Sequence, residues 1–354
     1  METKIVTVQD AALGENILVE AGEILRKGGL VAFPTETVYG LGGDALNPES
    51  SKKIYAAKGR PSDNPLIVHI CCMEDLQKIA VEIPKEAYAL AEAFWPGPMT
   101  MVLKKSPVVP YETTGGLDTV AVRMPNHPVA LALIEKSGGF IAAPSANTSG
   151  RPSPTSAKYV EEDLCGRIEM IIDGGFVGIG LESTIVDVTV TPPQILRPGY
   201  VTERMLQQVC GQVAWDEAIV HVESGKAPRA PGMKYRHYAP KGELVVVRGE
   251  NKRVVDYINQ CTDAAESAGE RTGVIATREN ASLYHAKVVH VAGAAGDEEE
   301  IARNLYDILR RFDEEGVTRI YSEEFSSEGL GQAIMNRLLK AAGQRIVDLS
   351  EKSS

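Results

Sequence analysis

Short apolar runs alternate with longer stretches of mixed polarity along most of the chain. The runs are β-branched or aliphatic, and each ends at glycine, proline or serine, which is typical of strands in a covered sheet. In the N-terminal part we predict strands at 30–33, 65–70, 100–105, 119–125, 140–145, 168–173 and 183–188. We predict helices at 15–27, 47–58, 84–95 and 128–136. This alternation predicts an α/β fold with helices covering the faces of a sheet.

The pattern changes near residue 213. Residues 213–241 are rich in proline and glycine and lack helical or strand periodicity, so we predict a linker. Beyond it we predict strands at 243–249, 272–277, 286–292 and 317–323, and helices at 252–268, 298–314 and 330–341. This rhythm predicts a second, smaller α/β unit. A chain of 354 residues is long enough for two domains, which we place at 1–212 and 242–354.

Charge and cysteine content narrow the class of protein. A formal net charge of −11 at pH 7 argues against a general nucleic-acid coat, which needs a broad basic face. It leaves room for a small anionic ligand, which needs only a local basic cluster. The five cysteines are scattered and include no C-x-x-C pair, so we expect reduced thiols. Since the sequence shows neither an apolar run of the roughly 18 residues of a membrane span nor a signal-peptide pattern, we expect a cytoplasmic protein without membrane contact.

Common nucleotide-binding and hydrolase signatures are missing from the sequence. It has no G-x-x-x-x-G-K-[ST], no G-x-G-x-x-G after a strand, no H-E-x-x-H and no G-x-S-x-G. We therefore expect neither a P-loop, nor a dinucleotide fold, nor the active sites of zinc proteases and serine hydrolases.

Two loops near the N-terminus carry candidate polar groups. The stretch PTETVYGLGGD at 34–44 is predicted to be a loop in which Thr35 and Thr37 lie beside several glycines. A tight turn would by itself explain these glycines, without any ligand. The stretch AAKGRP sets Lys58 and Arg60 on either side of one glycine. A K-x-R pair is more often solvated surface charge, but here prolines stiffen the turn and the glycine lets a ligand approach the backbone.

Further candidates lie at later strand ends. Asn64 can bond through its amide, and His69 lies in an apolar strand, where a histidine is more often a satisfied core residue than a ligand. The loop at 143–156 carries hydroxyls and one amide, which could cap a helix or donate to phosphate oxygens. Arg123 lies in an apolar strand and needs an anionic partner, for which a carboxylate from the protein or from a ligand is the natural choice.

The combined inventory favours one kind of chemistry. Lys58, Arg60, Arg123 and Arg197 lie among many neutral donors, including Ser183, and no nucleophile–base pair is evident. This set is suited to binding a polyphosphate and a carboxylate. Phosphoryl or nucleotidyl transfer can run on positioning and charge neutralisation alone, whereas acyl transfer through a Ser-His-Asp triad does not fit.

The motifs KGRP…NPLIVHI, PSANTSG, FPTETVYGLG and ESTIVD…ILRPG together resemble the YrdC-like threonylcarbamoyl-AMP synthases. PGMKYRHYAPKG and the smaller α/β unit resemble the long, two-domain form of that family. The resemblance implies a YrdC-like twisted open sheet with flanking helices at 1–212, a basic linker at 213–241 that is a candidate active-site lid, and a Rossmann-like α/β domain at 242–354. It implies a nucleotidyltransferase that condenses L-threonine, bicarbonate or CO2, and ATP to threonylcarbamoyl-AMP and diphosphate. The product serves the threonylcarbamoyladenosine modification of tRNA.

The same resemblance implies individual site residues. Catalytic contacts are implied for Lys58 and Arg60. ATP contacts are implied for Lys58, Arg60, Asn64, Thr119, Ser145, Asn147, Ser153, Arg197 and Tyr235. Contacts with L-threonine are implied for Thr37, His69, Arg123, Ala143 and Ser183. Mg2+ is expected to arrive with ATP and to take no protein side chain as a ligand, and no tightly bound organic cofactor is expected. The implied partners are ATP, L-threonine, bicarbonate and downstream tRNA threonylcarbamoyl-transfer proteins.

Two other functions stay open at this stage. The YrdC-like fold is also associated with double-stranded RNA binding, so the basic cluster could grip an RNA backbone, and a weak direct RNA contact stays open as well. Arg123 argues against an RNA-gripping surface, which would not place a cation within an apolar strand. A carbamoyltransferase of hydrogenase maturation also shares a YrdC-like domain, but such chains are longer and carry zinc-finger cysteine pairs that this sequence lacks.

Overall fold

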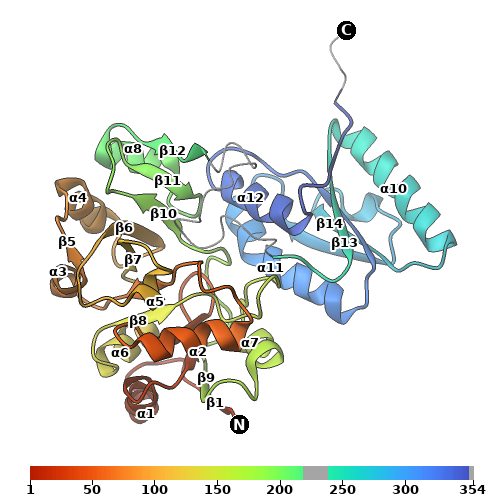
Figure 1. The fold of residues 1–354 in the computed structure, drawn as a ribbon. Helices are drawn as coiled ribbons and strands as arrows, with labels where there is room; N and C mark the ends of the chain where they lie inside the picture. Colours follow the sequence, from red (N-terminus) through yellow and green to blue (C-terminus); the bar gives the residue numbers. More distant parts are fainter. Residues whose placement is uncertain (218–237, 351–354) are drawn as a thin grey trace. The chain divides into compact units, whose positions relative to one another are not determined.

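The computed structural model describes residues 1–217 and 238–350, which form two compact units (Figure 1). The first unit contains residues 1–149 and 153–217, and the second contains residues 150–152 and 238–350. The second unit thus takes three residues from the middle of the first unit's sequence. The predicted linker lies partly, and Tyr235 lies entirely, outside the described residues.

A mixed sheet forms the centre of the first unit, with its strands in the order β1-β9-β2-β3-β8-β4-β7-β6-β10-β11-β12 and β5 paired to β6. Its strands are β1 Lys4–Thr7, β2 Val31–Phe33, β3 Gly40–Asp44, β4 Ile67–His69, β5 Ala80–Val81, β6 Met99–Lys105, β7 Thr119–Arg123, β8 Ile141–Ala143, β9 Met170–Asp173, β10 Thr184–Asp187, β11 Gln194–Arg197 and β12 Ala214–Trp215. Its helices are α1 Glu15–Arg26, α2 Pro48–Lys58, α3 Leu76–Ile79, α4 Lys85–Phe94, α5 Tyr111–Thr114, α6 Pro128–Lys136, α7 Ala157–Leu164 and α8 Glu203–Cys210, with a short 3-10 helix at Met73–Asp75.

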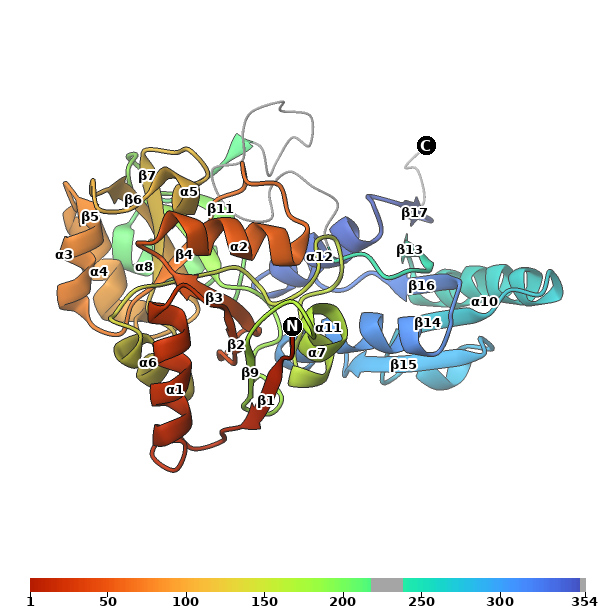
Figure 2. The ribbon, with the colours of Figure 1, turned by 60° about the horizontal axis from the view of Figure 1, so that its bottom comes forward.

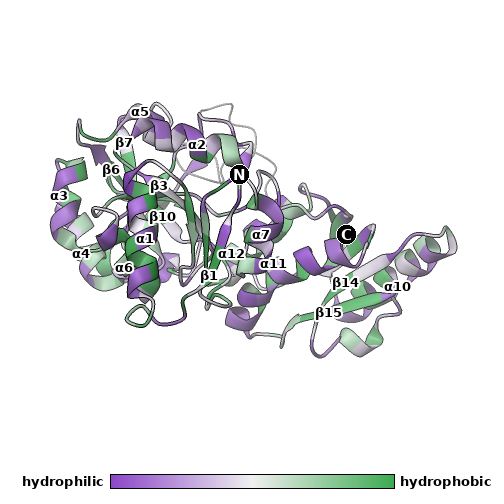
Figure 3. Cartoon of the chain, turned by 90° about the horizontal axis from the view of Figure 1, so that it is seen from below, coloured by the Kyte–Doolittle hydropathy of each residue, from purple (hydrophilic) through white to green (hydrophobic). Residues whose placement is uncertain are grey.

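Helices cover this sheet with apolar faces, as the sequence pattern predicted. Leu18 and Leu25 of α1 and Ile134 of α6 pack in one buried cluster with Phe33 of β2. The same two helices lie side by side in Figure 2, and in Figure 3 each carries both apolar and polar residues. A second and larger cluster includes Leu90 of α4 and other residues of the sheet and its helices. The predicted α/β class is confirmed.

Local signals in the sequence place the K-x-R turn. The side chain of Asn47 accepts a hydrogen bond from the backbone N–H of Glu49, and Pro48 occupies the first turn, so α2 starts where the sequence predicted. Gly59 ends the helix in the left-handed region, at φ 62° and ψ 37°. Lys58 therefore lies in the last turn of α2, and Arg60 lies just beyond it.

The predicted loop at 34–44 is wrong in its second half, because Gly40–Asp44 form strand β3. This strand pairs antiparallel with both β2 and β8. A Cβ atom on Gly42 would lie 2.8 Å from a side-chain carbon of Ile141. The glycines are therefore needed for close packing inside the sheet, and a sequence reading that treats glycine as a strand breaker misses this.

The second unit is built on a parallel sheet in the order β15-β14-β16-β13-β17. Its strands are β13 Glu243–Arg248, β14 Thr272–Thr277, β15 Val288–Gly293, β16 Arg319–Glu323 and β17 Ile346–Asp348. Its helices are α10 Asn251–Ser267, α11 Glu298–Glu314 and α12 Gly331–Ala341, with a 3-10 helix at Ala281–Leu283. The predicted smaller α/β unit is confirmed, whereas β17 was not predicted. Within the described ranges 1–217 and 238–350, no helix combines the length and the apolar character that a membrane span requires.

Candidate active site

Lys58 lies at the centre of a first group of predicted site residues. Its ammonium group donates to the backbone oxygens of Ser145 and, at 2.6 Å, of Asn147. The hydroxyl of Ser145 donates to the side-chain oxygen of Asn147 at 2.5 Å. The backbone N–H of Ser149 donates to the carbonyl of Lys58 at 2.9 Å, so the loop after β8 folds over the end of α2. These residues form the Lys58 cluster: Lys58, Ser145 and Asn147.

Arg60 and Asn64 lie next to this cluster in the same turn. The guanidinium of Arg60 donates to the carbonyl of Pro65 at 3.1 Å and lies 5.8 Å from the ring centre of Tyr55. Burial raises the pKa of Tyr55 to about 12, so its hydroxyl stays protonated and donates to the carbonyl of Asn64 at 3.1 Å. The side-chain amide of Asn64 is buried and, among the described residues, has no hydrogen-bond partner. An unsatisfied buried amide costs about 1–3 kcal/mol, so the fold alone does not explain an asparagine at this position.

Arg123 lies at the centre of a second group. Its guanidinium donates to the hydroxyl of Thr37 at 2.9 Å and contacts the carboxylate of Glu36 at 2.7 Å. The side chains of Arg123 and Glu36 are only 5% and 13% exposed, so their charges are largely desolvated. His69 lies opposite Arg123 in the register of β4 and β7. We call these residues the Arg123 cluster: Glu36, Thr37, His69 and Arg123. The anionic partner predicted for Arg123 is, in this structure, a carboxylate of the protein.

His69 is a neutral imidazole in this setting. Burial, and then the positive charge of Arg123, lower its pKa to about 3. Its Nδ1 atom lies 3.1 Å from the carbonyl oxygen of Ile67. The side chain therefore carries no charge at neutral pH.

The low pKa of His69 makes the stability of the first unit depend on pH. The unfolded chain protonates His69 below about pH 6.5 and the folded chain does not, so stability is lost as the pH falls from that value toward 3. Between pH 7 and pH 5 we expect His69 to reduce the free energy of unfolding by about 2 kcal/mol. Urea unfolding followed by tryptophan fluorescence measures this, because both tryptophans, Trp95 and Trp215, lie in the first unit. Between pH 7 and pH 5, the variant His69→Gln should lose about 2 kcal/mol less of its free energy of unfolding than the wild type loses. An equal loss in the two proteins would contradict the assignment.

Ser183 and Arg197 form a third pair, the Arg197 pair. Arg197 donates from Nε to the carbonyl of Ser183 at 3.0 Å and from Nη2 to its hydroxyl at 3.2 Å. Thr100 lies 2.8 Å from the same hydroxyl. Arg197 is the last residue of β11, so this predicted site residue lies on a strand that the sequence analysis did not predict.

Strand β3 and the segment before it join these groups. The carbonyl of Tyr39 accepts at 2.8 Å from the N–H of Ala146, the middle residue of the Ser145-x-Asn147 motif, and the N–H of Tyr39 donates at 3.0 Å to the carbonyl of Pro154. Gly180, just before the Arg197 pair, donates to the carbonyl of Thr37 at 3.0 Å. The stretch 35–40 therefore connects the Arg123 cluster, the Lys58 cluster and the loop before Ser183.

Three further predicted site residues, Ala143, Ser153 and Thr119, lie outside the two clusters and the Arg197 pair. Ala143 ends β8 and is buried. Ser153 is buried, and its hydroxyl donates to the carboxylate of Glu182 at 2.6 Å. Thr119 begins β7, four residues before Arg123, and thus lies roughly 13 Å from it along the strand. The β4–β7 register, which pairs Ile67 with Ala121, places Thr119 level with Pro65, whose carbonyl accepts from Arg60.

Glu36 and Glu182 are site residues that sequence reasoning missed. Each belongs to a motif that was singled out, PTETVYGLG and GLESTIVD, and each is flanked by a hydroxyl residue. An acidic residue next to hydroxyls and glycines was the available signal. What could not be read from the motif is that these carboxylates turn inward and bind Arg123 and Ser153.

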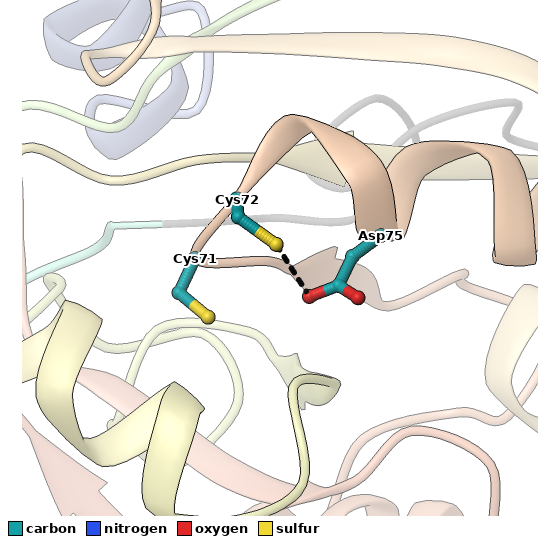
Figure 4. A group of neighbouring side chains, drawn as sticks. All are labelled: Cys71, Cys72 and Asp75. Carbon is teal, nitrogen blue, oxygen red and sulfur yellow. Dashed lines mark hydrogen bonds between the residues drawn. The ribbon is translucent and has the colours of Figure 1, made fainter.

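The cysteines are all free. Among the described residues, Cys71, Cys72 and Asp75 form a group of three side chains of the kinds that can bind a metal ion (Figure 4). The thiol of Cys72 donates to the carboxylate of Asp75 at 3.2 Å, and Lys78 binds the other oxygen of that carboxylate at 2.7 Å. Burial raises the pKa of Cys71 to about 11, which keeps it a neutral thiol. Hydrogen bonds within the protein therefore account for Cys72 and Asp75, and Cys71 is a neutral thiol beside them.

Comparison with known proteins covers nearly the whole chain. A family model described as "Telomere recombination" matches residues 23–199, and one described as "Threonylcarbamoyl-AMP synthase, C-terminal domain" matches residues 201–343. A threonylcarbamoyl-AMP synthase of Pyrococcus abyssi is 51% identical over 98% of this chain and 99% of its own length. One of Bacillus subtilis is 47% identical over 93% of this chain and 94% of its own length.

Solved structures agree with these matches. The structure of Pyrococcus abyssi Sua5 complexed with L-threonine has a TM-score of 0.92 and 49% identity to this chain. The match covers 99% of this chain and 100% of that one.

Proposed function

The chain belongs to the threonylcarbamoyl-AMP synthase family, and we propose that its first unit binds ATP and L-threonine on either side of the stretch 35–40. It is an ATP-using nucleotidyltransferase that makes threonylcarbamoyl-AMP, and the tRNA modification to threonylcarbamoyladenosine follows from its family. The observation that carries the placement of the substrates is the network that joins the Lys58 cluster to the Arg123 cluster through this stretch.

The Arg123 cluster supports binding of the amino acid. A free amino acid carries a carboxylate and an ammonium group on one carbon atom, and the buried pair of Arg123 and Glu36 offers the opposite charge to each. Thr37, Ser183 and Ala143 then surround the side chain and the remaining polar groups, and the neutral His69 supports them without adding charge. Because these groups are desolvated, each contact discriminates more sharply than it would at the surface.

The Lys58 cluster supports binding of the triphosphate. Lys58 brings a buried positive charge beside the hydroxyl of Ser145 and the amide of Asn147, and Arg60 and Arg197 add two more cations. Asn64 contributes an amide whose hydrogen-bonding capacity is unused among the described residues. Thr119 lies at the Arg60 end, where the adenosine part would extend. Tyr235, also implied as a contact, lies outside the described residues.

The donor set does not suit a metal held by the protein. Mg2+ takes hard oxygen ligands, and the two carboxylates of the site already bind Arg123 and Ser153. The group formed by Cys71, Cys72 and Asp75 consists largely of soft thiols, which Mg2+ does not prefer. We propose that Mg2+ enters with ATP and is held by phosphate oxygens and water.

These residues serve an in-line displacement. The amine of threonine adds to CO2 with loss of a proton, or condenses with bicarbonate with loss of water, to give a carbamate. The carbamate oxygen then attacks the α-phosphorus while diphosphate leaves. Lys58, Arg60 and Arg197 offset the negative charge that develops on the phosphates, and no protein nucleophile is required. Burial keeps water from the carbamate and from the mixed anhydride, both of which it would hydrolyse.

The chemistry of the product indicates which partners receive it and where in the cell the protein acts. Threonylcarbamoyl-AMP is an activated acyl donor, so we propose that tRNA threonylcarbamoyl-transfer proteins receive it, in the cytoplasm. Arg123 is only 4% exposed, which favours this function over a surface that grips double-stranded RNA. A salt-dependent affinity for duplex RNA, comparable with that for ATP, would favour the RNA-binding alternative.

Amino-acid-dependent release of diphosphate tests the proposed function. With ATP, Mg2+ and bicarbonate present, we expect release with L-threonine to exceed release with L-serine or glycine by at least tenfold, because the site contacts the methyl-bearing side chain as well as the charged groups. Omission of bicarbonate should abolish release in degassed buffer. Equal release with all three amino acids would contradict threonine specificity.

A further inference from the structure

We propose that Thr100 is a positioning residue for the amino-acid substrate, because it fixes the hydroxyl of Ser183 as a hydrogen-bond donor to a carboxylate or carbamate oxygen of that substrate. This inference rests on the proposed function, which places Ser183 in the threonine site. It goes beyond that function by giving the proton of Ser183 a direction and by giving a role to Thr100, which belongs to none of the sequence motifs.

Thr100, Ser183 and Arg197 form a buried network inside the first unit. Thr100 lies on β6, Ser183 comes directly before β10, and Arg197 ends β11. Strand β10 pairs with both β6 and β11, which brings the three residues together. Their exposed fractions are 0%, 1% and 5%, so their polar groups depend on partners within the protein or on a bound ligand.

Arg197 fixes one half of the bonding of the Ser183 hydroxyl. A guanidinium only donates, so the 3.2 Å contact from Nη2 of Arg197 uses one lone pair of the hydroxyl oxygen of Ser183. Nε of Arg197 also donates to the carbonyl of Ser183 at 3.0 Å. One planar group therefore holds the backbone and the side chain of Ser183 together.

Thr100 fixes the other half. Its hydroxyl lies 2.8 Å from that of Ser183, and by distance either group could be the donor. Among the described residues, this is the one hydrogen bond that the Thr100 hydroxyl makes, so one of the two protons lacks a protein acceptor. Thr100 is fully buried, whereas Ser183 is a proposed substrate contact. With substrate bound, both protons are satisfied only if Thr100 donates to Ser183 and Ser183 donates to the substrate.

This direction determines which group of the substrate Ser183 can bind. A hydroxyl has one proton and two lone pairs, and both lone pairs accept, from Arg197 and from Thr100. Ser183 therefore has no lone pair left for the ammonium group of the amino acid, and its partner is an oxygen atom. The carboxylate of threonine and the carbamate formed from its amine are both anionic acceptors, to which such a bond is strong. Accepting from a cation also makes the hydroxyl a better donor.

Substitutions in the full-length chain test the assignment. Ser183→Ala removes the donor and should raise the Kd of L-threonine, or lower kcat, by about tenfold. A higher Kd, measured by calorimetry without ATP and bicarbonate, identifies the carboxylate as the acceptor, and a lower kcat alone identifies the carbamate. Thr100→Val keeps the shape of the side chain and should change the same quantity by about fivefold. Thr100→Ser keeps the hydroxyl and should stay within about twofold of the wild type.

The double variant separates positioning from packing. If Thr100 acts through the hydroxyl of Ser183, Thr100→Val should add less than about twofold in the Ser183→Ala background. In Ser183→Ala the proton of Thr100 has lost its acceptor, so the second substitution should also recover part of the lost melting temperature. The same factor in both backgrounds would show that Thr100 acts on the fold and would overturn the inference.

Thr184→Val is the matched control. Thr184 is also buried, and its hydroxyl donates to the carbonyl of Val201 at 2.7 Å. The variant should lower the melting temperature and leave the Kd of L-threonine and kcat within about twofold of the wild type. The inference fails if Ser183→Ala changes neither quantity, or if Thr184→Val changes them as much as Thr100→Val does. If Thr100→Val does not fold, Thr100→Ala takes its place beside Thr100→Ser. Failure of the proposed function would look different, because the wild-type chain would then release no diphosphate with threonine.

Discussion

Replacement of Lys58 by alanine is expected to lower kcat/KM for ATP by about a thousandfold, equivalent to about 4 kcal/mol. The expected loss is large because Lys58 has two roles. It holds the loop through the carbonyls of Ser145 and Asn147, and in the proposed function it also brings a desolvated positive charge to the place where negative charge develops. Steady-state release of diphosphate at varied ATP concentrations measures the effect.

Lys53 is the matched control for this variant. It lies on the same helix, and its ammonium group also donates to a backbone carbonyl, that of Gly28, at 2.6 Å. Lys53→Ala should leave kcat/KM within about threefold of the wild-type value. If both alanine variants lost activity to a similar degree, the effect would come from the helix, and the assignment of Lys58 to the triphosphate would fail.

Replacement of Arg123 by methionine is expected to raise the KM of L-threonine by at least a hundredfold, with a much smaller change in the KM of ATP. Truncation of one partner of a buried, hydrogen-bonded charge pair typically costs about 2–5 kcal/mol of binding free energy. The same variant should also lose stability, because the carboxylate of Glu36 stays buried without its cation. The melting temperature and the two KM values are the measurements.

The double variant Arg123→Met/Glu36→Gln separates substrate binding from folding. It removes both charges of the buried pair, so most of the lost stability should return. The KM of L-threonine should stay high, since the substrate's carboxylate still lacks its cation. Recovery of threonine binding together with stability would show that Arg123 acts only on the fold.

Local chemistry explains why much of this molecule could be predicted. Asn47, Pro48 and Gly59 determine where α2 begins and ends, and the end of α2 places Lys58 and Arg60 in one turn. The loop after β8 follows a short apolar strand, so the position of Ser145 and Asn147 at a strand end could also be predicted. These features depend on neighbours in the sequence, which the motifs contain.

Other features depend on residues that lie far apart in the sequence. The glycines of β3 form a strand only because the partners β2 and β8 approach closely enough to need them. The carboxylate of Glu36 turns toward Arg123, a residue 87 positions later, and nothing in the motif around Glu36 indicates that partner. The prediction for Arg123 left its anion open between the protein and a ligand for the same reason.

By itself, the amino-acid sequence determined the α/β class, the boundaries of the main helices, the family and the identities of the polar groups at the strand ends, because periodicity, caps and motifs act over a few residues. Only the tertiary structure decided that Glu36 pairs with Arg123, that Glu182 accepts from Ser153, and that residues 150–152 belong to the second unit. These outcomes depend on which groups, distant in the sequence, meet in the desolvated interior. An unpaired charge or carbonyl there costs several kcal/mol, which is a large part of the net stability of a domain.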